Sequence, residues 1–154
     1  MSVSPSLENN TILLSVSASS PYIEGYQAAS IPSLQSGMFT RIDILGTYRW
    51  LDDGTSNVGY STIVIYENIY EGKTIHGTFA AGEKLMMRYL RPGDVVLTKI
   101  SDATTVKPSL QLIPDGAGWL REFEVGTDGS RPIAYCMEED LSPTFPRWTA
   151  VTIL

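Results

Sequence analysis

The sequence predicts an all-β protein, a small β-barrel or sandwich of short antiparallel strands with an extended N-terminal arm. Two observations lead to this fold class. Short runs of β-branched and aromatic residues recur along the chain, and such residues favour strands. Gly, Pro and Asp interrupt these runs about every eight to twelve residues, a turn spacing typical of β-sandwiches and barrels. No segment has the apolar spacing of a helix of useful length.

Residues 1–37 form the predicted arm, and residues 38–154 form the predicted β-domain, with a subdivision near residues 71–75 left open. The arm is rich in Ser and contains three prolines, and its run 11–16 has the composition of a strand. Residues 17–36 carry aromatic and aliphatic side chains without helical or strand periodicity. Freely disordered linkers are poor in such side chains. We therefore expect the arm to be ordered against its own domain or against a neighbour.

The first half of the β-domain contains alternating and β-branched runs that predict strands. The most β-prone of them is 62–69, which is rich in Ile, Val, Thr and Tyr. The other expected strands are 39–45, 47–51 and 74–79. Residues 52–57 have the Asp, Gly, Ser and Asn composition of a turn or loop.

The second half of the β-domain contains the clearest turn. Arg91-Pro92-Gly93-Asp94 predicts a type II turn, because proline sets the φ of the first central position and glycine supplies the positive φ of the second. A glycine-rich turn is also expected at 114–118. The strands expected around these turns are 84–89, 94–100, 109–113, 119–125, 133–137 and 148–154.

Charge and hydropathy exclude two classes of partner. The formal net charge is −6, and the eleven basic residues are scattered along the chain without a cluster of three. Nucleic-acid binding depends on Lys and Arg that neutralise phosphates, so no nucleic-acid partner is expected. The chain has no run of apolar residues long enough to span a membrane, and its start lacks the features of a signal peptide. We expect a protein that is made and folded in a cytoplasm.

Catalytic chemistry is not predicted. A triad mechanism needs a histidine held beside a nucleophile, and the single histidine, His76, is followed by glycine in a β-prone run without any Gly-x-Ser-x-Gly elbow in the chain. The single cysteine, Cys136, lies in an apolar run and is interpreted as a buried strand residue. The acidic run 138–140 is expected to solvate a strand end. The protein is therefore predicted to be no enzyme and to use no cofactor.

Metal binding is not predicted either. Zinc sites draw on several Cys and His ligands, and this chain has one of each, sixty residues apart. The acidic loop 52–57 does not match the ligand spacing of an EF-hand, so a hairpin turn is the simpler interpretation.

Aromatic and aliphatic side chains in the arm and the loops are the remaining candidates for partner contact. Trp and Tyr are enriched at the energetic centres of interfaces, although they also fill cores. Trp119 follows a glycine turn and Phe145 stands beside prolines, which favours exposure. The residues predicted to contact a partner or a second copy of the chain are Tyr22, Tyr26, Ile31, Leu34, Trp119 and Phe145.

Four short motifs between residues 75 and 154 carry a resemblance to a known family. They are Ala80-Ala81-Gly82-Glu83, Gly93-Asp94-Val95-Val96, Ile133-Ala134-Tyr135-Cys136-Met137-Glu138 and Val151-Thr152-Ile153-Leu154. In this half the chain resembles the small β-barrel type of capsid decoration, or cement, proteins of tailed bacteriophages. Ala134 and Tyr135 replace smaller residues of that pattern, and residues 1–74 lie outside it.

The resemblance implies a virion protein on the outer capsid surface, a homotrimer that binds the major capsid protein and stabilises its subunit contacts. Two alternatives remain open: another virion β-protein, such as a tail or head–tail connector component, and a carbohydrate-binding module that uses Trp119, Phe145 or Trp148 as a stacking platform. From the sequence, deletion of residues 1–37 is expected to weaken attachment more than folding.

Overall fold

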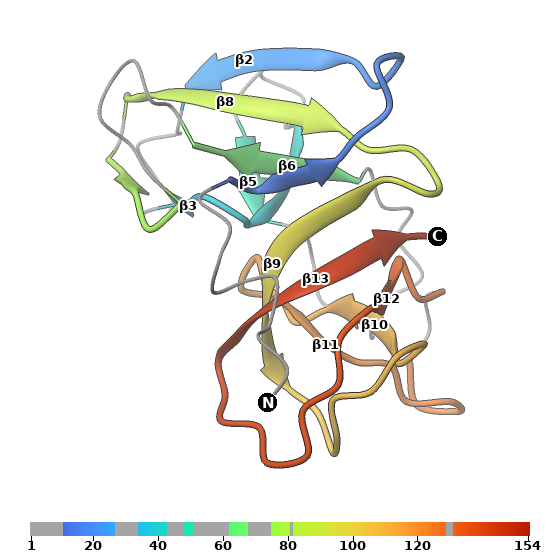
Figure 1. The fold of residues 1–154 in the computed structure, drawn as a ribbon. Helices are drawn as coiled ribbons and strands as arrows, with labels where there is room; N and C mark the ends of the chain where they lie inside the picture. The colour runs from blue at the N-terminus through green and yellow to red at the C-terminus, as the bar shows by residue number, and fades with distance from the viewer. Residues whose placement is uncertain are drawn as a thin grey trace.

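The computed structural model describes residues 11–26, 34–42, 48–50, 62–67, 75–80, 82–128 and 131–154. All regular structure in these residues is β, which confirms the predicted fold class. Figure 1 shows two bodies, a sheet that contains β2 and β8 at the top and a barrel built around β9 and β13 below it. The loop at 52–57 and the subdivision near 71–75 lie in or beside residues that the structure does not describe.

The barrel is a closed ring of five strands in the order β9-β11-β10-β12-β13, and β13 pairs again with β9. Its longest seam joins β9 and β13, from Arg147 opposite Ile100 to Thr152 opposite Val95. The barrel is mixed rather than purely antiparallel, because β11 runs parallel to β9. The barrel strands are β9 (Val95–Asp102), β10 (Gln111–Pro114), β11 (Leu120–Glu122), β12 (Ala134–Cys136) and β13 (Arg147–Ile153).

Strand direction gathers three loops at one end of the barrel. β11 is parallel to β9, and β10 is antiparallel to both β11 and β12. The carboxyl ends of β9, β11 and β12 therefore lie at the same end of the ring. The segments 103–110, 123–128 and 137–146 follow those ends, and we call them the distal loops. They lie in the lower part of Figure 1, away from the upper sheet.

The upper body is an antiparallel five-stranded sheet in the order β2-β8-β6-β4-β5, accompanied by the two-stranded pair β3-β7. Its central strand β6 (Ile63–Tyr66) is buried on both sides: Ile63 and Ile65 enter one hydrophobic cluster and Val64 enters the other. This explains why its sequence is a continuous apolar run without alternation. The other strands are β2 (Tyr22–Tyr26), β3 (Leu34–Gln35), β4 (Phe39–Ile42), β5 (Tyr48–Trp50), β7 (Thr78–Phe79) and β8 (Lys84–Tyr89).

The N-terminal segment is ordered against its own domain. Its first strand, β1 (Leu13–Ser15), pairs with the barrel strand β9, and β2 pairs with β8 along its whole length. Ile12 and Leu34 have no exposed surface, and each belongs to one of the two cores. The part of residues 1–37 that the structure describes therefore connects the barrel with the upper sheet.

A buried carboxylate holds this connection in place. Asp94 is only 3% exposed, at the end of the 91–94 turn. It accepts hydrogen bonds from the Ser17 amide at 2.8 Å, the Ser20 hydroxyl at 2.7 Å and the Arg91 amide at 2.8 Å. Burial by itself would raise the pKa of Asp94, but these hydrogen bonds and the nearby Arg88 guanidinium lower it overall. The carboxylate is thus ionised at neutral pH and fastens residues 17–20 to the start of β9.

The turn predicted at 91–94 is present. The Asp94 amide donates to the Arg91 carbonyl at 3.0 Å, and Gly93 has a φ of +94°, as the third position of a type II turn requires.

Candidate interaction surface

The predicted contact residues of the N-terminal segment fall in different environments. Tyr22 lies on β2 with 45% of its surface exposed, and its ring centroid is 6.4 Å from that of Tyr66. Leu34 lies on β3 and is fully buried, so its side chain packs within its own chain and offers no surface to a partner. Tyr26 belongs to β2, but its side chain is outside the description, as is the whole of Ile31.

The two predicted contact residues of the barrel are half-buried. Phe145 packs against the barrel core, and Trp119 packs against the core of the upper sheet. Neither is among the strongly exposed hydrophobic side chains of the described residues. Contact of Tyr22, Trp119 or Phe145 with a partner stays a prediction.

Trp119 and Trp148 form a joint between the two bodies. Their rings meet edge to face with centroids 6.0 Å apart, and the Lys99 ammonium lies 5.0 and 5.1 Å from the two centroids. His76 meets the Trp148 ring in the same edge-on manner at 5.8 Å. Trp148 packs against the barrel core and Trp119 against the upper core. The two indoles are packed edge to face beside Lys99, an arrangement suited to joining the cores rather than to offering one flat platform to a sugar ring.

The joint leaves no room for a side chain at Gly37. This buried glycine has a φ of +91°, and a Cβ added to it would lie 2.9 Å from Cζ3 of Trp148 and 3.4 Å from Cδ1 of Ile12. Its carbonyl accepts a hydrogen bond from the Thr98 hydroxyl at 2.8 Å. Gly37 is therefore a point at which the upper sheet approaches the barrel closely.

Replacing Gly37 with alanine is expected to lower the free energy of unfolding by about 2–4 kcal/mol, from left-handed backbone strain plus overpacking against Trp148. Gly126→Ala is the matched control, because Gly126 has a φ of +84° with no atom within 4 Å of the added Cβ. It carries the strain alone, about 1 kcal/mol. Urea unfolding of both variants measures the difference. Equal losses would show that Trp148 does not restrict this position.

The structure places His76 and Cys136 in different environments. His76 is exposed and lies against Trp148, whereas Cys136 is fully buried in β12. Burial raises the pKa of the Cys136 thiol, which donates a hydrogen bond to the Glu138 carbonyl at 3.3 Å. A buried thiol with a raised pKa is a packing residue rather than a reactive one.

The position of Glu138 contradicts the expectation that the acidic run 138–140 solvates a strand end. This residue is only 6% exposed. Its Oε2 accepts the Ala150 amide hydrogen bond at 2.5 Å and lies 3.6 Å from Nη1 of Arg147. Burial raises the pKa of Glu138, while the Ala150 amide and the Arg147 charge act in the opposite direction. The carboxylate satisfies a backbone amide of β13 inside the barrel wall.

Two distal loops are fastened by the same device, an arginine on a barrel strand that holds an aspartate seven residues away. Arg121 donates to both carboxylate oxygens of Asp128 from its two terminal guanidinium nitrogens, at 2.5 and 3.0 Å. Arg147 donates from Nε to Asp140 at 3.0 Å. The loop backbone joins each clamp, since the Glu124 amide donates to Asp128 at 2.7 Å and the Ser142 amide to Asp140 at 3.0 Å.

The clamps hold both aspartates in the ionised form. The Arg121 hydrogen bonds are the main cause of the lowered pKa of Asp128. The Ser142 amide is the largest cause of the lowered pKa of Asp140; burial opposes it, and Arg147 lowers the pKa further. The loops are thus closed at neutral pH by charge-assisted hydrogen bonds, which are stronger than neutral ones.

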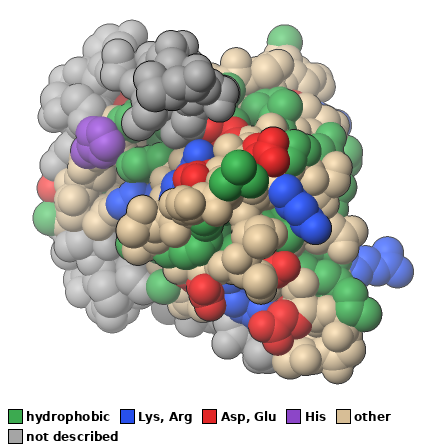
Figure 2. All heavy atoms as spheres, turned by 60° about the horizontal axis from the view of Figure 1, so that its bottom comes forward, with side chains coloured by type: hydrophobic (Ala, Val, Ile, Leu, Met, Phe, Trp, Pro, Cys, Tyr) green, Lys and Arg blue, Asp and Glu red, His purple; other side chains and the backbone are tan. Residues whose placement is uncertain are grey.

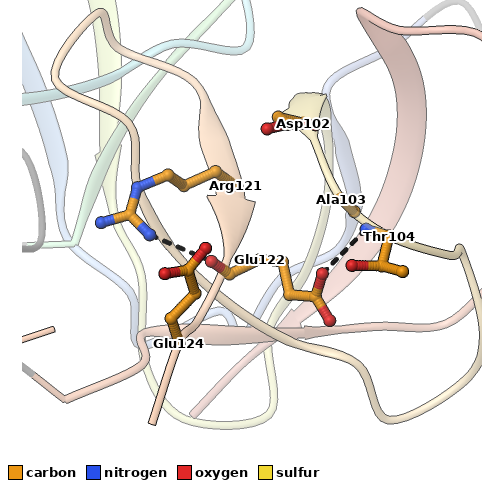
Figure 3. A pocket seen from close by; sticks show the side chains of 6 residues that line it. All are labelled: Asp102, Ala103, Thr104, Arg121, Glu122 and Glu124. Carbon is orange, nitrogen blue, oxygen red and sulfur yellow. Dashed lines mark hydrogen bonds between the residues drawn. The ribbon is translucent and has the colours of Figure 1, made fainter. Parts of the chain in front are cut away.

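A small polar cavity lies beside the first clamp. Its volume is about 190 Å³, and Figure 3 shows the side chains around it. The Glu122 carboxylate accepts the Thr104 amide at 2.8 Å, and Arg121 donates to the Glu122 carbonyl at 3.0 Å (Figure 3). These polar groups already bind one another and connect β11 to the loop after β9. The cavity is lined by Asp102, Ala103, Thr104, Arg121, Glu122 and Glu124.

Two observations concern metal and membrane. In the part of the chain that the structure describes, no group of three or more His, Cys, Asp or Glu side chains is placed to hold a metal ion. None of these residues belongs to a helix with the length and hydrophobicity needed to span a bilayer.

The distal loops carry the most exposed hydrophobic side chains of the described residues. Leu141, next to the clamped Asp140, is 88% exposed, and Val125, three residues before the clamped Asp128, is 86% exposed. Met137 is 47% exposed at the start of the third loop. Figure 2 looks toward this end of the molecule and shows acidic, basic and hydrophobic side chains close together. None of these three residues was among the predicted contact residues. The signal was weak, because a lone Val or Leu in a loop has no pattern around it.

No protein-family model and no curated protein matches the chain.

Proposed function

We propose that this protein is a non-enzymatic capsid decoration, or cement, protein. It binds the outer surface of a phage head as a homotrimer and stabilises the contacts between subunits of the major capsid protein. Two features support this role: the motifs of the C-terminal half and the rigid architecture of the barrel.

One observation carries the proposal: three motif segments that are far apart in the sequence are neighbours in the barrel. Gly93 donates to the Ile153 carbonyl at 2.8 Å, and Ile153 donates to the Asp94 carbonyl at 2.9 Å. Within the barrel wall, Val151 pairs with Val96 of β9 on one side and with Cys136 of β12 on the other. Three of the four motifs therefore fall on one contiguous piece of the fold, the β12-β13-β9 seam, which supports a shared architecture over a chance match of short words.

The physical character of the barrel supports the same role. A closed ring leaves no free sheet edge between its own strands, and the clamped loops restrict motion at its distal end. A protein that reinforces a shell needs such rigidity, since each attached copy must resist relative movement of the subunits that it contacts. Several weak contacts from one trimer raise the effective affinity without a single tight site.

An electron-microscopy map of the parent particle tests the proposal. We expect density for this chain on the outside of the capsid in many symmetric copies. A map without it on the capsid exterior would overturn the proposal, and six or twelve copies at a vertex would favour a connector component instead. Light scattering of the purified protein provides a second measurement, in which a stable monomer would contradict the homotrimer.

A further inference from the structure

We infer that the distal loops form the docking surface, and that they bind a protein surface with apolar recesses bordered by Lys and Arg. The inference rests on the proposed function, under which this partner is the exposed face of the major capsid protein. It adds which end of the molecule makes the contact and which kinds of side chain on the partner surface bind that end.

The first argument is exposure. Val125 and Leu141 leave 86% and 88% of their surface in contact with solvent, although burying an aliphatic side chain of this size is favourable by about 1.5–3 kcal/mol. A single exposed aliphatic residue is ordinary. Here two nearly fully exposed ones stand on loops at the same end of the barrel, with Met137 as a half-exposed third.

The second argument is that the loops are held ready to bind. Arg121 and Arg147 clamp the aspartates at positions 128 and 140, three residues from Val125 and one residue from Leu141. A side chain on a loop that is already ordered loses less conformational entropy on binding than one on a free loop. The same clamp, built twice beside the two most exposed aliphatic side chains, is expected of a contact surface.

The loops also form one layer rather than three separate projections. The Thr104 amide on the first loop binds Glu122 at the end of β11, at 2.8 Å. The Asp140 amide on the third loop binds the Val106 carbonyl of the first, at 2.9 Å. A partner that meets this end would contact a connected surface, as a stable interface requires.

Charge determines the kind of partner. Residues 102–110, 121–128 and 137–147 contain seven acidic and three basic residues, a formal net charge of −4 out of the −6 of the whole chain. Arg121 and Arg147 are paired with Asp128 and Asp140, and Glu138 is buried, so exposed carboxylates such as Glu124 and Glu139 outnumber the exposed Lys107. Complementary charge steers association, and like charge opposes it. A basic partner surface fits this end, whereas the same end of a second copy does not.

The test is binding of the full-length protein to capsid shells of the parent phage assembled without it, measured by co-sedimentation. The double variant Val125→Ser with Leu141→Ser is expected to bind at least about tenfold more weakly than the wild type. The matched control is Leu154→Ser, because Leu154 is also exposed, at 48%, but follows the opposite end of β13. The control is expected to bind like the wild type.

Raising the salt from about 50 mM to about 300 mM is expected to weaken wild-type binding several-fold, because it screens exposed charges.

The outcomes separate this inference from the proposed function. A wild-type protein that does not bind the shells would overturn both. Wild-type binding with an equally strong double variant would overturn the inference alone and leave the decoration role standing. A double variant that binds weakly because it no longer forms the oligomer, as seen by light scattering, would show that the loops contact a second copy and would also overturn the inference.

Discussion

Deletion of residues 1–37 is expected to abolish cooperative folding. The deletion removes β1, β2 and β3, together with the fully buried side chains of Ile12 and Leu34. Loss of one large buried aliphatic side chain costs about 2–5 kcal/mol, against a typical total stability of about 5–15 kcal/mol. The deletion also takes away Ser17 and Ser20, two of the three residues that bind the buried Asp94 carboxylate. Far-UV circular dichroism during heating would show no sharp transition.

This expectation replaces the one drawn from the sequence, in which the segment serves attachment more than folding. A point variant separates packing from chain length: Ile12→Ala is expected to cost about 3 kcal/mol, and the exposed Val125→Ala less than about 0.5 kcal/mol. A truncated protein that melts cooperatively within a few degrees of the full chain would contradict the packing described for β1 and β2.

Asp94→Asn is expected to lower the free energy of unfolding at neutral pH by about 3 kcal/mol. The substitution replaces one carboxylate oxygen with an NH2 group, which cannot accept the hydrogen bonds that the Ser17, Ser20 and Arg91 donors give to the carboxylate. The network joins the 17–20 segment to the 91–94 turn, and Arg88 and Arg91 add hydrogen bonds to the carbonyls of Ser20 and Ser19 at 2.9 and 3.2 Å. Urea unfolding measures the loss. Asp102→Asn is the control, since Asp102 is exposed at the end of β9, and it is expected to change stability by less than about 0.5 kcal/mol.

The cost of Asp94→Asn is expected to depend on pH. The pKa of Asp94 is lowered in the folded state, so its ionised form contributes stability above the unfolded-state pKa of about 3.9. That contribution is lost as the pH falls from there through the folded-state pKa. The wild type should therefore approach the variant in stability below about pH 4. A difference that stayed constant down to pH 2 would show that the carboxylate charge is not what stabilises the connection.

Local sequence patterns predicted much of the strand content. The run at 84–89 corresponds to β8, the 94–100 run to β9 and the 148–154 run to β13, with ends that differ by two residues or fewer. The 91–94 turn was predictable because Pro and Gly act through their own backbone preferences, which do not depend on the rest of the fold.

Other elements had no local signal. β2, with the sequence Tyr-Ile-Glu-Gly-Tyr, contains a glycine and a charge and has no clear alternation, yet it pairs with β8 residue by residue. Its strand conformation comes from the neighbouring backbone rather than from its own propensity, since strand preference depends strongly on context. Glu138 gives the same lesson for a side chain, because its burial depends on the Ala150 amide twelve residues away.

The sequence alone determined that this chain is an all-β protein with a single buried cysteine and a lone histidine, because strand propensity, turn geometry and the supply of chemical groups are local properties. Only the tertiary structure decided that β13 closes the ring against β9, that the N-terminal strands belong to both bodies, and that three loops meet at one acidic and apolar end. Those features depend on pairings between residues far apart in the sequence, from 18 positions between Thr104 and Glu122 to 83 between Leu13 and Val96. Such pairings form only when the whole chain buries its cores together, and no short stretch of sequence encodes them.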